Sequence, residues 1–150
     1  QKKIKIPIIS MPKEVYLHTK NKCKKNSKIG ILATEGTLKK NVYSKFFNKN
    51  FNLISPKKTL QINSVNKAIK YVKMGKIKKA EKVIRPAISH LIKMKCTKII
   101  LGCTELPIAI FAFKSFKKIK LSKIFLDPNL ILANASMRKY KIFKSANLKS

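Results

Sequence analysis

A cysteine, a threonine and a glutamate stand directly after an apolar run, in the segment IILGCTELP at residues 99–107. A deprotonated thiol acts as a base or nucleophile, and a nearby carboxylate either orients a substrate ammonium group or makes a capping hydrogen bond. We predict that Cys103 lies where a buried strand leads into a helix, whose dipole would lower the pKa of the thiol. The alternative is a buried structural cysteine, which is the commoner role of a free cysteine.

A second polar segment, ATEGT at residues 33–37, also follows an apolar run. Its backbone N–H groups and the hydroxyls of Thr34 and Thr37 would suit a carboxylate or a phosphate at the start of a helix. It lacks the lysine of a Walker A loop. An N-capping turn, in which Thr37 caps the next helix, is an equally good interpretation. Asp127-Pro128 is a third polar segment that follows an apolar run.

The elements that would position these segments are short apolar runs separated by longer amphipathic stretches. Two of the runs are continuous rather than alternating, as expected for parallel strands that are covered on both faces. Strands that alternate with helices predict a parallel, doubly wound α/β sheet, in which ligands bind beyond the carboxyl ends of the strands. We predict strands at residues 4–10, 28–34, 51–56, 97–103 and 123–128, and helices at residues 37–48, 59–73, 76–95 and 128–146.

Pro86 does not fit the helix predicted at residues 76–95, where the apolar residues otherwise keep helical spacing. Inside a helix, proline removes a hydrogen bond and clashes with the preceding turn, at a cost of roughly 3 kcal/mol. We therefore expect a kink or a break there. By contrast, Asp127-Pro128 is a favourable start for the last helix, since proline is well tolerated in the first turn.

The charge of the chain is extreme, with 36 lysines and arginines against 5 acidic residues and a formal net charge of +31. Such a charge would attract polyanions without specificity. However, only Arg85 and Arg138 are arginines, whereas specific readers of nucleic acids favour arginine for its bidentate fork. The lysines are spread along the chain among asparagine, isoleucine and phenylalanine, whose codons are also rich in A and T. We therefore favour mutational bias over a nucleic-acid function.

The three cysteines, Cys23, Cys96 and Cys103, form neither a CxxC pair nor a standard zinc spacing. His90 together with Cys96 and Cys103 is a poor match to the usual structural metal sites. We expect reduced thiols in the cytoplasm, no metal and no membrane segment, because no apolar run approaches about 18 residues. At 150 residues the chain is long enough for one domain, and because it begins with glutamine on a strand-like run we expect it to be part of a longer product.

Four motifs, taken together and in order, resemble the aspartate/glutamate racemase superfamily. They are GILATEGTL at 30–38, YVKMGK at 71–76, ILGCTELP at 100–107 and LDPNLILANAS at 126–136. The chain looks most like the aspartate racemase branch, because glutamate racemases typically carry a histidine where this chain has Glu105. Aspartate racemases also carry a lysine followed two residues later by glycine, about thirty residues before the cysteine, as Lys73 and Gly75 stand here.

The resemblance implies a cofactor-independent racemase with a flavodoxin-like fold, forming one domain of a two-domain protein. Two thiols would face the α-carbon of the substrate from opposite sides, one removing the α-proton and the other returning a proton. It implies that Cys103 is one of these thiols and that Lys73 pairs a substrate carboxylate. Thr34, Thr37 and Thr104 would hydrogen-bond the substrate, and Glu105 would take part less directly. Aspartate is the implied substrate, and a homodimer is the implied assembly.

The resemblance covers only the C-terminal two-thirds of a typical member, and the second thiol is missing. In the family that thiol lies in an asparagine-threonine motif upstream of a segment like IPIIS, and neither Cys23 nor Cys96 has a matching context. We therefore interpret residues 1–150 as the C-terminal part of a racemase-like protein without its N-terminal lobe, and expect this chain alone to be inactive. The alternatives are a hydantoin racemase, an arylmalonate decarboxylase, which needs one thiol, an inactive remnant, and a basic nucleic-acid-binding module.

Overall fold

The core of the protein is a four-stranded parallel sheet with the strand order β2-β1-β3-β4. The computed structural model describes residues 8–111 and 123–147. This sheet and its flanking helices confirm the predicted α/β class, and the order is that of the first four strands of a flavodoxin-like sheet. Of the strand predicted at 4–10, residues 1–7 lie outside the described part, and residues 8–10 form no strand. The strands are β1 (Lys28–Ala33), β2 (Asn52–Ile54), β3 (Lys98–Gly102) and β4 (Phe125–Leu126).

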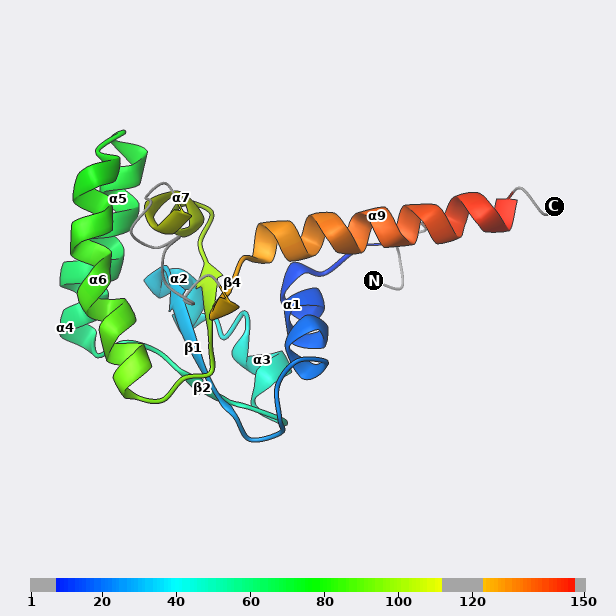
Figure 1. The fold of residues 1–150 in the computed structure, drawn as a ribbon, viewed down its shortest axis with the longest axis horizontal. Helices are drawn as coiled ribbons and strands as arrows, with labels where there is room; N and C mark the ends of the chain where they lie inside the picture. The colour runs from blue at the N-terminus through cyan, green and yellow to red at the C-terminus, as the bar shows by residue number, and fades with distance from the viewer. Residues whose placement is uncertain (1–7, 112–122, 148–150) are drawn as a thin grey trace.

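Helices cover both faces of the sheet, with α5 and α6 on one side and α1 and α3 on the other (Figure 1). The region predicted as one helix at 37–48 forms two short helices, and the region at 59–73 is a continuous run of three segments, of which η1 is a π-helix. The described helices are α1 (Met11–Lys20), α2 (Glu35–Lys39), α3 (Ser44–Phe47), α4 (Lys58–Leu60), η1 (Gln61–Asn66), α5 (Lys67–Lys73), α6 (Ile77–Lys93), α7 (Glu105–Phe111) and α9 (Pro128–Asn147).

Successive side chains of β1 enter two different apolar cores. Ile29 and Ile31 pack with the aromatic residues of the α1 and α3 layer, whereas Leu32 packs against the α5 and α6 layer. This alternation follows from the pleat of a strand, which turns neighbouring side chains to opposite faces. Because both faces are buried, the strand reads as a continuous apolar run, as predicted. Because Gly30 has no side chain, Leu91 of α6 can pack directly over it. The Cδ1 of Leu91 lies 2.9 Å from the position that a Cβ on residue 30 would take.

Helix α6 is continuous through Pro86, so of the expected kink or break, the break is wrong. Lys82 and Pro86 both lie on the exposed side of the helix, where water replaces the hydrogen bond that proline removes. The hydroxyl of Ser64, on η1, donates to the carbonyl of Val83 in the turn before the proline. This contact ties α6 to η1 at the point where the helix is locally weakened.

Helix α1, which the sequence did not predict, packs against α9 on one side of the sheet. Glu14 of α1 is buried, and its carboxylate lies 3.3 Å from the ammonium of Lys139 on α9. Helix α9 extends well beyond the body formed by the sheet and the other helices (Figure 1). None of the described helices is both long and apolar enough to cross a lipid bilayer.

Candidate active site

Two of the three polar segments that follow apolar runs lie side by side at the carboxyl edge of the sheet. Strands β1 and β3 are paired in register from Ile29 with Lys98 to Ala33 with Gly102. Thr34 and Cys103 are the next residues on the two strands. Strand β2 follows β1 in the chain and pairs with one of its edges, and β3 follows β2 but pairs with the opposite edge of β1. Thr34 and Cys103 therefore flank the point where the strand order reverses. Ligands of open α/β sheets bind at this point.

The thiol of Cys103 is held by the carboxylate of Glu105. Its Sγ donates a hydrogen bond to Oε2 of Glu105 across 2.8 Å, and Oγ1 of Thr104 donates to the same oxygen across 3.0 Å. The other carboxylate oxygen lies 3.6 Å from Nζ of Lys73. The structure therefore gathers the four predicted site residues Lys73, Cys103, Thr104 and Glu105 around one carboxylate.

The pKa of Cys103 is raised to about 11, above its ordinary value of 9.0. Burial of the half-buried thiol is the main cause, followed by its hydrogen bond to Glu105; the negative charge of that carboxylate also raises the pKa, and Lys73 offsets part of the shift. The backbone N–H of Glu105, at the start of the helix, does lower this pKa, but burial and the Glu105 side chain outweigh it, so the predicted net lowering is wrong. The helix that follows is only seven residues long, and the carboxylate in its first turn opposes a thiolate. At neutral pH, Cys103 is a thiol and thus a proton donor.

The pKa of the Glu105 carboxyl group is shifted in the opposite direction, below its ordinary value. Its hydrogen bond from the Cys103 thiol is the largest of the causes that lower its pKa, and Thr104 and Lys73 contribute in the same direction. Glu105 is therefore ionised at neutral pH, as its contact with the Lys73 ammonium requires. A negative acceptor fixes the direction of the thiol hydrogen, because a carboxylate offers only lone pairs.

Lys73 reaches this carboxylate because α5 stops at the right residue. Gly75 adopts φ +69°, and its N–H bonds the carbonyl of Val72, while the N–H of Lys76 bonds the carbonyl of Tyr71. These two bonds form a Schellman motif, which glycine favours because it lacks a Cβ. The lysine-x-glycine spacing singled out above thus has a structural cause, since the glycine ends the helix and leaves Lys73 in its last turn.

We expect replacement of Lys73 by methionine to change the chemistry of the site more than the stability of the fold. The side chain of Lys73 is 65% exposed, and exposed ion pairs contribute only about 0–1 kcal/mol. Urea unfolding of Lys73→Met should therefore give a free energy of unfolding within about 1 kcal/mol of the natural chain. The control is Lys70→Met, an exposed lysine of the same helix. A larger loss for Lys73→Met alone would show that this lysine supports the fold.

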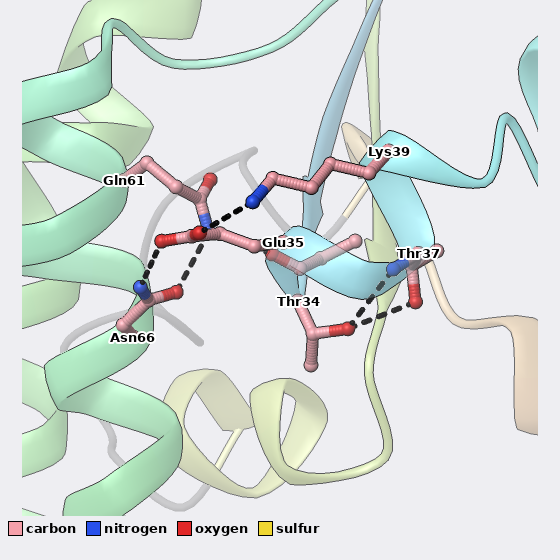
Figure 2. A network of polar contacts seen from close by, with 7 residues as sticks. Thr34, Glu35, Thr37, Lys39, Gln61 and Asn66 are labelled. Atoms are coloured by element: carbon pink, nitrogen blue, oxygen red, sulfur yellow. Dashed lines mark hydrogen bonds and ion pairs between the residues drawn. The ribbon is translucent and has the colours of Figure 1, made fainter.

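The Thr34–Thr37 turn is an N-cap, but the capping residue differs from the predicted one. Thr34, not Thr37, caps α2, because Oγ1 of Thr34 accepts a hydrogen bond from the N–H of Thr37 across 3.3 Å. The two hydroxyls lie 3.0 Å apart (Figure 2). This capping bond explains why threonine stands at this position. The hydroxyl of Thr37 keeps lone pairs or a hydrogen for a further partner.

A polar network that the sequence analysis missed supports this turn from the η1 side. Gln61 donates from Nε2 to the carbonyl of Ala33 and to Oδ1 of Asn66, in both cases across 2.9 Å. Asn66 in turn donates to Oε1 of Glu35, whose other oxygen lies 3.7 Å from Nζ of Lys39 (Figure 2). Gln61 and Asn66 come from a segment about thirty residues away, so only the fold brings them here. The network holds the carboxyl end of β1 against η1.

Tyr43 also lies near this edge of the sheet, and no pattern in the sequence predicts its position. Its ring is buried, and Cε2 lies 3.4 Å from the place where a side chain on Gly102 would begin. Its hydroxyl lies 3.9 Å from Sδ of Met11. Burial, and to a lesser extent the charge of a Cys103 thiolate, raise the pKa of Tyr43 to about 12. Gly102 is therefore the residue that lets this ring lie beside the thiol segment.

The remaining candidates have other places in the described structure. Cys96 is buried in the core, and Cys23 is half-buried in the segment after α1, so neither joins Cys103. Asp127 caps α9, because its Oδ1 accepts from the N–H of Asn129 across 2.9 Å. Within the described part of the chain, no three histidine, cysteine, aspartate or glutamate side chains gather as metal ligands would.

Comparison with known proteins gives a consistent result. A family model described as Asp/Glu/Hydantoin racemase matches residues 1–135. The structure of Picrophilus torridus aspartate racemase matches with a TM-score of 0.67 at 23% identity, covering 88% of this chain and 52% of that one. An aspartate racemase homologue from Pyrococcus horikoshii OT3 matches with a TM-score of 0.70 at 21% identity, covering 97% and 59%. The chain thus spans between half and three-fifths of the length of these structures.

Proposed function

This chain belongs to the Asp/Glu/hydantoin racemase family, and we propose that it carries one half of a cofactor-independent racemase site for a small amino acid, with aspartate as the substrate. In this proposal Cys103 is one of two acid/base thiols. The observation that carries it is the contact of Sγ of Cys103 with Glu105 at the tip of β3, beside Lys73. Of the described cysteines, Cys103 alone follows a strand at the carboxyl edge.

The protonation state of Cys103 supports the part of proton donor in this proposal. A racemase of this kind needs a thiolate that takes the α-proton and a thiol that returns a proton to the opposite face of the carbanion. With a pKa of about 11, Cys103 rests as the thiol. It therefore gives its proton to the carbanion and is left as a thiolate, while the other thiolate has gained the α-proton. The reverse direction then starts from the Cys103 thiolate.

The neighbours of Cys103 supply the contacts that a dicarboxylic amino acid needs. Lys73 would pair a substrate carboxylate. Because its side chain is exposed, its ammonium could turn to the substrate from its present position 3.6 Å from Glu105. The hydroxyls of Thr34, Thr37 and Thr104 would hydrogen-bond the carboxylates. Glu105 would then attract the substrate ammonium group while it still accepts the S–H bond. Charge placed in this way stabilises a developing carbanion.

The proposal includes the expectation that these 150 residues alone do not racemise amino acids. Neither Cys23 nor Cys96 reaches the edge where Cys103 lies. Cys103 does not line the cavities of about 210, 300 and 400 Å³ that lie among the described residues. A carbanion intermediate needs a site that excludes water. In this proposal, a second thiol and an enclosing wall come from outside these residues.

Two measurements test the proposal separately. Chiral chromatography after incubation of L-aspartate with the purified chain should show no D-aspartate; its appearance would contradict the half-site. Aspartate should nevertheless slow the alkylation of Cys103 by iodoacetamide, measured by peptide mass spectrometry, and should leave Cys23 unaffected. Lys73→Met should abolish this protection, whereas Lys70→Met should keep it. Absence of protection in the natural chain would remove the support for a substrate site.

A single-thiol decarboxylase of malonates is a second candidate, favoured by the same pKa. Such an enzyme needs one protonated thiol, which delivers its proton to the carbanion left after loss of CO2. Cys103 meets this requirement without a partner thiol. Release of CO2 from an arylmalonate by the chain, abolished in Cys103→Ala, would establish it in place of the racemase. The cytoplasmic location, the homodimer and the absence of specific nucleic-acid and membrane partners stay predictions.

A further inference from the structure

A cationic concave surface lies beside α1 and α9, and one part of it reaches the amino end of β3, whereas Cys103 follows the carboxyl end of that strand. Two hollows of about 300 and 400 Å³ share His18 as a common lining residue. The first lies against α9, and the second lies against the first residue of β3 and against β4. From Lys98 to Gly102, β3 spans about 13 Å at the usual rise per residue. The surface is therefore separate from the proposed racemase site.

The charges around these hollows have one sign. Lysine and arginine residues line them from four parts of the fold, and no aspartate or glutamate lines either hollow among the described residues. The acidic residues of the adjoining elements are occupied, since Glu14 pairs with Lys139 and Asp127 caps α9. The cationic residues are Lys22 after α1, Lys98 on β3, Lys123 before β4, and Arg138 and Lys141 on α9.

We propose that this surface binds a small anion that carries two or more phosphate groups, with His18 at its centre and Arg138 as the main bidentate contact. Arginine presents a planar fork that matches two phosphate oxygens, and charge-assisted bonds of this kind are short and strong. The combined hollows are too large for a single ion and fall within the range of small-molecule sites. Cations that converge on a hollow suit a compact anion better than the extended phosphate track of a nucleic acid.

The protonation of His18 supports this ligand class. Burial lowers the pKa of His18 below its ordinary value of 6.5, and Lys22, Arg138 and Lys98 lower it further. The free protein thus keeps a neutral imidazole among like charges. A bound polyphosphate would reverse this field and favour the imidazolium, so binding takes up a proton. Affinity should therefore increase as the pH falls from 8 to 6.

The chain offers an internal control for the test, because His18 and His90 are its only histidines. His90 lies on α6, in a different layer of the fold. Proton NMR of the two imidazole rings during titration with inorganic pyrophosphate, in about 0.1 M salt, should show a rise in the pKa of His18 of about one unit. The ring signals of His90 should not respond to pyrophosphate.

Variants then distinguish a built site from the general charge of the chain. Arg138→Gln should weaken pyrophosphate binding about tenfold, and Lys22→Gln should weaken it less. Lys78→Gln, which removes the same charge from α6, should have no effect. Equal shifts of both histidines, or an equal loss in Lys78→Gln, would overturn the proposal in favour of non-specific adsorption. A shift of His18 with duplex RNA or DNA but not with pyrophosphate would overturn it in favour of a nucleic-acid surface.

Discussion

Replacing Glu105 by glutamine should make Cys103 react roughly tenfold faster with iodoacetamide at pH 8. Only the thiolate reacts, and its fraction at a pH below the pKa rises tenfold for each unit by which the pKa falls. The negative charge and the hydrogen bond of Glu105 are among the causes that raise the pKa of Cys103 to about 11. The neutral amide removes the charge but keeps the size, whereas burial, the largest cause, is retained.

The pH profile gives the same prediction a second readout. In the natural chain the rate of Cys103 alkylation should keep increasing with pH until about 11, where the thiol is half ionised. In Glu105→Gln the profile should move to lower pH. In Lys73→Met it should move to higher pH, because the ammonium of Lys73 lowers the pKa of this thiol. Opposite directions for the two variants would be hard to produce by unfolding, which exposes the thiol in both.

Glu35→Gln is the matched control, since Glu35 lies at the neighbouring strand end but bonds to Asn66 and Lys39 instead. Its rate of Cys103 alkylation should equal that of the natural chain within about twofold. Cys23 and Cys96, followed in the same digest, report any general loosening of the fold. An unchanged Cys103 rate in Glu105→Gln would mean that burial alone suppresses the thiolate, and would leave Glu105 without a part in the chemistry.

The site shows which features of a sequence carry structural information. The parallel type of the sheet could be predicted because β1 and β3 are buried on both faces and read as continuous apolar runs. The neighbourhood of Thr34 and Cys103 followed from parallel pairing alone. Helix α1 gave no signal, because only Glu14, Val15 and Thr19 of its ten residues are buried. A stripe of one apolar and two polar residues does not resemble an amphipathic helix.

The features that were missed depend on residues far apart in the chain. Tyr43 lies beside Gly102, and Gln61 bonds to the end of β1, yet nothing around either residue indicates these contacts. The error on the pKa of Cys103 has a different origin. Burial of the thiol, followed by its hydrogen bond to the Glu105 side chain, raises the pKa more than the N–H at the start of the helix lowers it. Glu105 stands two residues from Cys103, so its charge was visible in the sequence, but its orientation was not.

The largest loss of stability should come from Leu91→Ala, at about 3 kcal/mol in urea unfolding. Leu91 is fully buried and lies over Gly30 of β1, so its removal leaves a cavity between α6 and the sheet. The control is Ile92→Ala on the same helix, where the side chain is 39% exposed. That variant should lose less than about 1 kcal/mol, since little apolar area returns to water. Equal losses in both would show that α6 is stabilised by helix propensity rather than by this contact.

The contact between Leu91 and Gly30 should also appear as coupling between the two positions. Gly30→Ala alone should destabilise the fold by about 1–3 kcal/mol, because its Cβ would lie 2.9 Å from Cδ1 of Leu91 and 3.2 Å from Cγ1 of Ile99. In Gly30→Ala combined with Leu91→Ala, the added methyl group enters the space that the leucine leaves. The loss in the double variant should therefore be smaller than the sum of the single losses by about 1 kcal/mol. Additive losses would mean that α6 moves to close the cavity, and that the glycine serves the backbone rather than this side chain.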